Sequence, residues 1–282
     1  MTVAIQLTDV VTHHGEGIGW HCGESAVKLV DMLAGDVLTL RSDGSVDRRR
    51  VGAVAAAWRP RSRGGMVVGT ERGFATYDAS GVREWETEVW ADPSVRMNDG
   101  ACDPQGRFYC GSMAYSPRSG AGALWRLDPD HSVHLVRDGL TISNGLVWSL
   151  DGREAFHVDT PTGRIDGYRV DQATGEFVER RTVVEVTGGA PDGMTIDAEG
   201  GLWVALWGGS AVHRYERSGV LSAVVEVAAS QVTSCGFGGE ELDRLHITTS
   251  RDGLTQDDDP AAGAVFVADV GVRGVPLHPF GG

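Results

Sequence analysis

Oxygen-bearing side chains precede a glycine at four well-separated places in the chain, namely Glu16, Asp99, Asn144 and Asp192. Carboxylate and amide oxygens, with no sulfur or obvious set of imidazoles beside them, are the ligands that Ca²⁺, Mg²⁺ and Mn²⁺ prefer. The neighbouring glycine would let a ligand approach the backbone. If the fold brings these positions together, the sequence predicts a site for a divalent cation, and Zn²⁺ held by carboxylates and water stays open.

The alternative is that these pairs are ordinary turns, because Asn and Asp before glycine are common turn residues. A single pair is therefore weak evidence, and the prediction depends on their register. Segments 98–103, 143–148 and 191–196 align with one another, and their glycines at positions 100, 145 and 193 are 45 and 48 residues apart. Each segment continues through a glycine-containing turn into an apolar stretch. This regular spacing favours a repeat over coincidence.

The elements between these positions are short. Apolar stretches at 26–32, 66–69, 108–110, 202–206 and 245–248 are bounded by turn-forming residues, which is typical of many short antiparallel strands. A sandwich, a barrel or a propeller would fit this pattern. Weaker copies of the repeat at 16–20, 53–58 and 233–237 bring the number to six, so that 282 residues give 47 for each copy. That period is typical of a four-stranded propeller blade.

We therefore predict an all-β fold, a six-bladed β-propeller with four-stranded antiparallel blades, that spans residues 1–282 as a single domain. In such a fold the innermost strand of each blade runs along a central channel. Equivalent repeat positions then lie at equivalent heights around one axis. The oxygen-bearing residues would converge there, although they are far apart in sequence.

The composition excludes several classes of protein. Lys and Arg number 25 against 39 Asp and Glu, and the formal net charge of -14 disfavours binding to nucleic acid. The chain is 41% hydrophobic, enough for a folded core, and no apolar run reaches the ~20 residues of a membrane helix. The first residues do not resemble a signal peptide, so we expect a cytoplasmic protein without membrane contact. Four dispersed cysteines without a CxxC pair predict buried, reduced thiols.

Other candidate chemistry is weaker. The sequence contains no Gly-x-Ser-x-Gly or Ser-x-x-Lys motif for a serine nucleophile. His14 would share a strand face with Glu16 and is a conceivable ligand, but the adjacent pair His13-His14 favours a solvated surface. The acidic segment 256–260 lacks the glycine and closing glutamate of an EF-hand, which favours an exposed loop. Trp207 could line the site or belong to the core.

A series of motifs runs along nearly the whole chain. They are GEGIGW at 15–20, RMNDG at 96–100, DPQGRF at 103–108, GSM at 111–113, ISNGL at 142–146, PDGM at 191–194, TSCGFGG at 233–239 and GAVF at 263–266. With these motifs the chain resembles the SMP-30/gluconolactonase/regucalcin-like family. The resemblance implies a six-bladed propeller with one catalytic divalent cation in its channel, and lactone hydrolysis as the usual activity.

The resemblance also implies roles for individual residues. The implied metal ligands are Glu16, Asn144 and Asp192. Arg96 and Asn98 would contact the substrate, with Asn98 beside the metal, and Asp192 would also be the acid/base. The repeat register points to Asp99, whereas the resemblance points to Asn98. We follow the resemblance and leave Asp99 as a group behind the ligands.

One position departs from the resemblance. Animal regucalcin-like members have a substrate-binding glutamate three residues after a Gly-Thr-Met motif, and the corresponding residue here, counted from 111–113, is Ser116. A carboxylate that would accept hydrogen bonds from sugar hydroxyls is therefore missing at this position. The identity of the substrate cannot be inferred from the resemblance.

The expected function is hydrolysis of an aldonolactone to its aldonic acid. The cation would polarise the lactone carbonyl, while Asp192, the cation or both activate the attacking water and Arg96 fixes the substrate. Ca²⁺ is the first expectation for the cation, with Zn²⁺, Mn²⁺, Mg²⁺ and Fe²⁺ as alternatives. A non-sugar lactone or a phosphoester on the same site, and a calcium-binding propeller without catalysis, remain open. The expected partner is a small molecule, and the expected assembly is a monomer or weak homo-oligomer.

Overall fold

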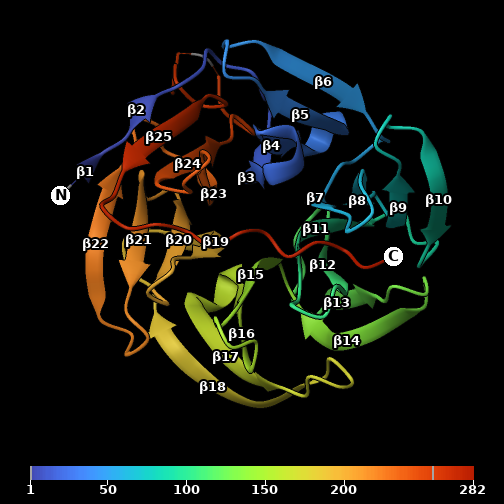
Figure 1. The fold of residues 1–282 in the computed structure, drawn as a ribbon. Coiled ribbons are helices and arrows are strands. Elements are labelled where there is room, and N and C mark those ends of the chain that lie inside the picture. The colour runs from blue at the N-terminus through green and yellow to red at the C-terminus, as the bar shows by residue number, and fades with distance from the viewer. Residues whose placement is uncertain (1, 256) are drawn as a thin grey trace.

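The computed structural model describes residues 2–255 and 257–282. Within them the chain forms 25 β-strands and three short 3-10 helices. The strands assemble into six sheets arranged around a common axis, and neighbouring strands within each blade are antiparallel (Figure 1). The predicted six-bladed β-propeller is therefore confirmed.

The blades follow one another along the chain. Blade 1 contains β3 (Gly15–His21), β4 (Ala26–Asp31), β5 (Asp36–Leu40) and β6 (Val46–Arg50). Blade 2 contains β7 (Ala57–Pro60), β8 (Met66–Gly69), β9 (Gly73–Tyr77) and β10 (Arg83–Glu88). Blade 3 contains β11 (Val95–Cys102), β12 (Phe108–Ala114), β13 (Gly122–Leu127) and β14 (Val133–Leu140).

The second half of the ring repeats this order. Blade 4 contains β15 (Ser143–Trp148), β16 (Glu154–Asp159), β17 (Arg164–Val170) and β18 (Phe177–Glu185). Blade 5 contains β19 (Ala190–Ile196), β20 (Leu202–Trp207), β21 (Ala211–Tyr215) and β22 (Leu221–Glu226). Blade 6 contains β23 (Val232–Gly238), β24 (Arg244–Thr249) and β25 (Val265–Asp269). The helices are η1 (Cys22–Glu24), η2 (Met32–Ala34) and η3 (Thr160–Thr162).

The N-terminal strands close the ring. Strand β2 (Ile5–Gln6) pairs antiparallel with β25 and supplies the outer strand of blade 6. Strand β1 (Thr2–Val3) pairs in parallel with β22, as a fifth strand of blade 5. The first residues of the chain thus join the last two blades, a detail that the repeat pattern did not predict.

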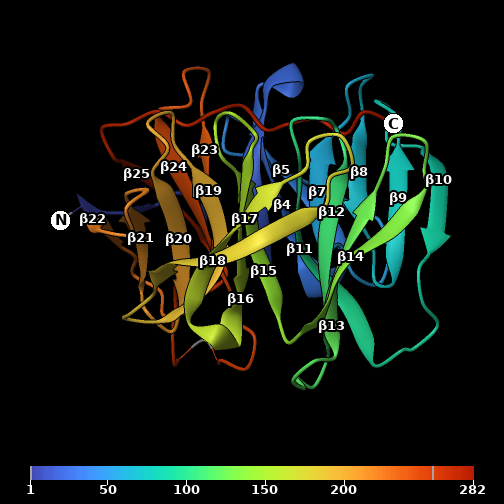
Figure 2. The ribbon, with the colours of Figure 1, turned by 90° about the horizontal axis from the view of Figure 1, so that it is seen from below.

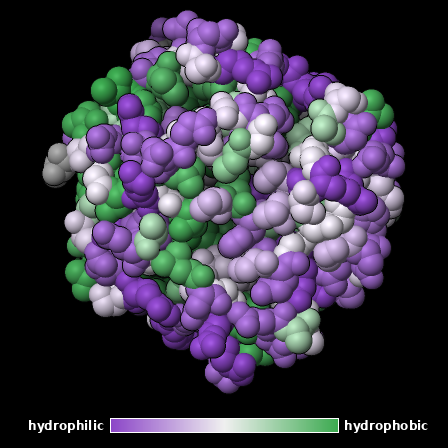
Figure 3. Space-filling model, in the orientation of Figure 1, coloured by the Kyte–Doolittle hydropathy of each residue, from purple (hydrophilic) through white to green (hydrophobic). Residues whose placement is uncertain are grey.

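The C-terminal segment 270–282 crosses one face of the propeller, seen in red in Figures 1 and 2. Its backbone bonds to blades on both sides of the ring: Gly274 N–H donates to Leu242 O (2.8 Å), and Phe280 N–H donates to Pro60 O (2.8 Å). The Phe280 side chain is 0% exposed and belongs to the largest apolar cluster. In Figure 3 side chains fill the centre of this face, so the channel is closed at this end.

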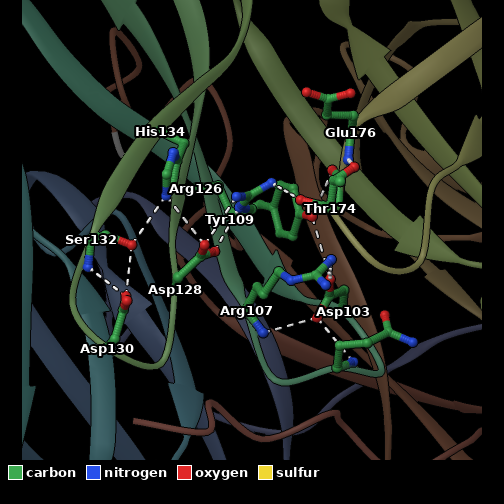
Figure 4. A network of polar contacts seen from close by, with 12 residues as sticks. Asp103, Arg107, Tyr109, Arg126, Asp128, Asp130, Ser132, His134, Thr174 and Glu176 are labelled. Atoms are coloured by element: carbon green, nitrogen blue, oxygen red, sulfur yellow. Dashed lines mark hydrogen bonds and ion pairs between the residues drawn. The ribbon is translucent and has the colours of Figure 1, made fainter.

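Polar contacts add to the packing between blades 3 and 4 (Figure 4). Arg107 of blade 3 donates to the carbonyl oxygens of Gln172 and Ala173 (2.8 and 2.9 Å), and Tyr109 Oη donates to Gly175 O (3.0 Å). Because these bonds satisfy the carbonyls of the β17–β18 loop, they fix the outer part of blade 4 against blade 3.

Two sequence predictions concern the cysteines and membrane-spanning segments. All four cysteines are free, as predicted; Cys102, Cys110 and Cys235 are buried, but Cys22 is exposed, because it lies in the short helix η1 at the surface. Among residues 2–255 and 257–282, no helix is both long and apolar enough to cross a bilayer.

The closure by the C-terminal segment predicts a loss of stability in a Phe280→Ala variant. Removal of a fully buried phenylalanine ring should lower the free energy of unfolding by about 3–5 kcal/mol. Chemical denaturation followed by tryptophan fluorescence measures this change. The matched control is Val220→Ala at an exposed position, which should change stability by less than about 0.5 kcal/mol. Equal midpoints for the two variants would show that the segment does not stabilise the ring.

Candidate metal centre

The innermost strands of five blades share an irregularity. Pairing with the second strand shifts register between Glu16 and Gly19 in β3, between Met97 and Gly100 in β11, and at corresponding places in β15, β19 and β23. Such a bulge takes residues out of the ladder and turns their side chains in a new direction. Strand β7 pairs regularly, and blade 2 contributes none of the predicted ligands.

Several of the predicted site residues occupy these bulges, whereas Glu16 and Arg96 are paired at or before their start. Asn98 and Asp99 lie in the irregularity of β11, Asn144 in that of β15 and Asp192 in that of β19. The alternative that the Asn-Gly and Asp-Gly pairs form turns between strands is therefore wrong. The sequence pattern marks bulges within inner strands, because both structures need short polar residues and glycine.

The glycines beside these residues have a different role from the one expected. A Cβ atom on Gly145 would lie 2.5 Å from Asp192 O, and one on Gly193 would lie 2.8 Å from Thr233 O. Each of these glycines therefore faces the inner strand of the next blade, and not a ligand. Their absence of a side chain allows neighbouring inner strands to approach, which brings Asn144 and Asp192 close to each other.

A chain of hydrogen bonds connects the polar residues. Arg96 Nη1 donates to Asn98 Oδ1 (2.7 Å), and Asn98 Nδ2 donates to Asn144 Oδ1 (3.2 Å). Asn144 Nδ2 in turn donates to Thr160 Oγ1 (2.9 Å), which donates to Pro191 O (2.9 Å), next to Asp192. The structure thus brings together the predicted residues of blades 3, 4 and 5.

Two buried carboxylates complete the site. Glu16 and Asp192 are 2% and 5% exposed. Burial, followed by the nearby negative charges of Asp192 and Asp99, raises the pKa of Glu16 well above its usual value. Burial and Asp99 do the same to the pKa of Asp192. Asp192 Oδ1 is buried and has no hydrogen-bond partner among the described residues.

This donor set fits a hard divalent cation. Glu16 and Asp192 supply carboxylate oxygens, Asn144 supplies an amide oxygen, and the orphaned Asp192 Oδ1 is a free acceptor. A cation would offset the repulsion that raises both carboxyl pKa values. Within the described part of the chain no group of three or more His, Cys, Asp and Glu side chains has metal-binding geometry.

Asp99 lies near both carboxylates, since its charge contributes to their raised pKa values, and it also borders an axial cavity. Its Oδ1 accepts a hydrogen bond from Gly100 N–H (2.7 Å), and the residue lines this cavity of about 140 Å³ together with Arg59. Residues 275–278 of the C-terminal segment line the same cavity. Asn98, by contrast, bonds directly to Asn144. The geometry therefore favours Asn98 over Asp99 as the residue beside the metal ligands.

His14 is not on the solvated surface. It is only 7% exposed, and its Nδ1 lies 2.7 Å from Ser250 Oγ. Burial, with a smaller contribution from the positive charge of Arg96, lowers the pKa of His14 to about 3, so the ring is neutral near pH 7. Its ring lies 6.0 Å from that of Trp207, which is half-buried, so both line the same end of the channel. The expectation of a solvated His14 is wrong. Of the adjacent residues His13 and His14 only His13 is exposed, because His14 lies directly before β3.

Two further predictions concern loops. Ser116 is exposed and lies, next to Tyr115, in the loop that follows β12. In the segment 256–260, residue 256 lies outside the described residues. Asp257, Asp258 and Pro260 are exposed, as predicted for this loop. The carboxylates of Asp258 and Asp259 accept hydrogen bonds from Thr255 and Ser230.

Sequence reasoning missed two residues at the same end of the channel. Glu71 follows β8 and Tyr115 follows β12, so both lie near Arg96. Tyr115 Oη donates to Glu71 Oε1 (2.7 Å), and the Arg96 guanidinium carbon lies 5.7 Å from the Tyr115 ring centroid. Neither residue belongs to the repeat, and no signal in the sequence could have paired them.

The fold and the site define a six-bladed β-propeller with a buried oxygen-donor centre near its axis. Residues 14–251 match the family model described as the SMP-30/Gluconolactonase/LRE-like region, and the chain belongs to this family.

Relatives match over most of the chain. Regucalcin of Danio rerio is 35% identical over 284 residues, which cover 95% of each chain. The crystal structure of regucalcin from Agrobacterium tumefaciens, named as a calcium-binding protein, is 27% identical and has a TM-score of 0.93 with 99% of each chain covered. The structure of a luciferin-regenerating enzyme is 28% identical, with a TM-score of 0.85 and 96% of each chain covered.

The donor set predicts that Ca²⁺ binding depends on both carboxylates. Glu16→Gln keeps the side-chain volume but removes one charge, and should weaken Ca²⁺ binding by more than about tenfold in isothermal titration calorimetry. Glu179→Gln is the matched control. Glu179 is exposed on the outer strand of blade 4, where it forms an ion pair with Arg169 of the neighbouring strand. A Glu16→Gln variant that binds Ca²⁺ as tightly as the control would remove Glu16 from the ligand set.

Proposed function

We propose that this protein is a divalent-metal-dependent lactonase that opens a sugar lactone to the corresponding aldonic acid. The observation that carries this function is the pair of buried carboxylates, Glu16 and Asp192. One oxygen of this pair, Asp192 Oδ1, has no hydrogen-bond partner among the described residues. Buried charges of one sign need a compensating partner, and a divalent cation supplies it. Membership of a family that includes gluconolactonases supports lactones as the substrates.

Glu16, Asn144 and Asp192 would hold the cation through their side-chain oxygens. Ca²⁺ suits this set because it prefers carboxylate and carbonyl oxygens, and the name of the Agrobacterium relative supports the same ion. When bound, such a cation polarises a lactone carbonyl and stabilises the negative charge that develops on its oxygen.

Arg96 and Asn98 would orient the substrate. Arg96 Nη1 is engaged by Met97 O (2.9 Å) and Asn98 Oδ1 (2.7 Å), so the guanidinium is fixed. Arg96 Nη2 has no hydrogen-bond partner among the described residues and remains available to donate to substrate oxygens. Charge-assisted hydrogen bonds from a rigid donor fix a ligand well, because little further ordering is needed.

Asp192 would move the proton. An oxygen of Asp192 that does not hold the cation accepts a proton from the attacking water as the water oxygen bonds to the carbonyl carbon. The same proton then passes to the ring oxygen as the carbon–oxygen bond of the lactone breaks. Hydrolysis thus needs no covalent intermediate with the protein, in agreement with a sequence that offers no serine nucleophile motif.

A second candidate is a calcium-binding propeller without catalysis, which the name of the Agrobacterium relative favours. The two candidates differ in the effect of removing the ion. A structural ion that holds the blades together contributes to stability alone, whereas a catalytic ion is needed for turnover in a protein that stays folded.

Chelated protein therefore tests the function. Wild-type protein stripped with EDTA should lose hydrolysis of γ- and δ-aldonolactones, measured by acid release near pH 7, and regain it with Ca²⁺, Mn²⁺, Mg²⁺, Zn²⁺ or Fe²⁺. Circular dichroism controls for folding of the stripped protein, and unsubstituted lactones and phosphoesters complete the panel. Failure of every cation to give lactone turnover, with the ion bound and the fold intact, would favour the non-catalytic candidate.

The proton-transfer role predicts a difference between the two carboxylates. At saturating cation, Asp192→Asn should reduce kcat by more than about 100-fold, whereas Glu16→Gln should recover most of its kcat. Steady-state kinetics over a range of Ca²⁺ concentrations separates the loss of the ion from the loss of the base. Near-normal kcat of metal-loaded Asp192→Asn would refute the role of Asp192 in proton transfer.

A further inference from the structure

Two side chains, Glu71 and Tyr115, lie on the side of Arg96 at the end of the propeller where the inner strands begin. Glu71 follows the second strand of blade 2, and Tyr115 follows the second strand of blade 3. Because inner strands start and second strands end at the same end of each blade, both residues lie at the level of Arg96 and Asn98.

Glu71 is attached to blade 3 at two points. Its carbonyl oxygen accepts a hydrogen bond from Met97 N–H (2.7 Å), and its carboxylate oxygen Oε1 accepts one from Tyr115 Oη (2.7 Å). Met97 lies between Arg96 and Asn98, so the backbone bond places Glu71 directly beside the residues assigned to the substrate. A half-buried carboxylate with two fixed contacts has little freedom to move.

Tyr115 is held at both ends. Its backbone N–H donates to Ser94 O (2.9 Å), and its hydroxyl donates to Glu71. The ring lies over the Arg96 guanidinium at 5.7 Å, a cation–π contact, yet Tyr115 is 44% exposed. Burial and the Glu71 carboxylate raise the pKa of Tyr115 to about 12, which keeps the hydroxyl protonated as a donor.

We propose that Glu71 and Tyr115 form a wall that orients the free Nη2 of Arg96 and thereby selects hydroxylated lactones over unsubstituted ones. The inference rests on the proposed lactonase function and deepens it by naming two residues that position Arg96 for the hydroxyl groups of the substrate. Glu71 fixes Tyr115, Tyr115 covers one face of the guanidinium, and the guanidinium presents donors that only a substrate with additional oxygens can use. The exposed face of the phenol ring offers an apolar surface for the C–H face of a sugar ring.

The test compares two δ-lactones that differ only in hydroxylation, glucono-1,5-lactone and δ-valerolactone. Glu71→Ala and Tyr115→Phe remove the hydrogen bond between the two side chains, and Tyr115→Phe keeps the ring over Arg96. Each should raise the KM for glucono-1,5-lactone at least about fivefold, with kcat within about twofold of wild type. The KM for δ-valerolactone should stay within about twofold, because this substrate does not use the donors.

Two further variants serve as controls. Glu71→Gln keeps an acceptor for the Tyr115 hydroxyl and should restore a KM closer to that of wild type than Glu71→Ala does. Glu88→Gln removes an exposed carboxylate of blade 2 that pairs with Arg72, and should leave both lactones unaffected. Equal KM increases for both lactones, or a fall in kcat without a change in KM, would overturn the selecting role of the wall.

Failure of the proposed function gives a different result. If metal-loaded wild type hydrolyses neither lactone, the lactonase proposal falls, and the wall is judged by calorimetric binding of glucitol, a neutral hydroxylated chain. At least about fivefold weaker binding by Glu71→Ala, with no change in Glu88→Gln, would support the wall as a recognition element for hydroxyl groups. Equal affinity in the two variants, or no binding by wild type, would overturn it.

Discussion

The close approach of inner strands around the axis is the constraint on which the rest of the structure depends. At Gly145, Gly193 and Gly236 a Cβ atom would lie 2.2–2.8 Å from the backbone of the next blade. Only glycine tolerates such spacing, because any side chain would push the blades apart. Gly145 and Gly193 lie within bulges, and these bulges also release the preceding residues Asn144 and Asp192 from the ladder and direct them to a common site.

The convergence of Glu16 and Asp192 on one site changes the charge balance of their carboxyl groups. Glu16 and Asp192 come from blades 1 and 5, and burial, together with the negative charges nearby, raises both carboxyl pKa values. Arg96 is a nearby cation, but its Nη1 bonds to Asn98 and Met97, not to either carboxylate. The fold therefore builds an acidic site whose charges the protein itself does not pair. A site of this kind is suited to a cation that arrives from solution.

The sequence predicted the fold because glycine spacing and turn residues are local signals of a repeat. Five of its six copies fall on inner strands, and the copy at 53–58 overlaps β7 only at its last two residues. The Asn-Gly and Asp-Gly pairs mark positions that the structure does bring together. The environment of His14 could not be predicted, because its burial depends on Ser250 and Trp207 from blades 6 and 5. The contact between Glu71 and Tyr115 could not be predicted for the same reason. The two residues lie in loops that meet only through the packing of blades, and neither loop follows the repeat.

The two ends of the channel differ in what they can do. At one end residues 275–278 cover an axial cavity that Asp99 lines, and Phe280 fixes the segment in the core between blades 2 and 3. The loops after the second strands lie at the opposite end, where the inner strands begin. Those loops vary in length from blade to blade without disturbing the inner strands. The predicted metal ligands thus belong to the repeat, whereas Glu71 and Tyr115 lie in loops outside it, so these loop residues can differ without altering the inner strands.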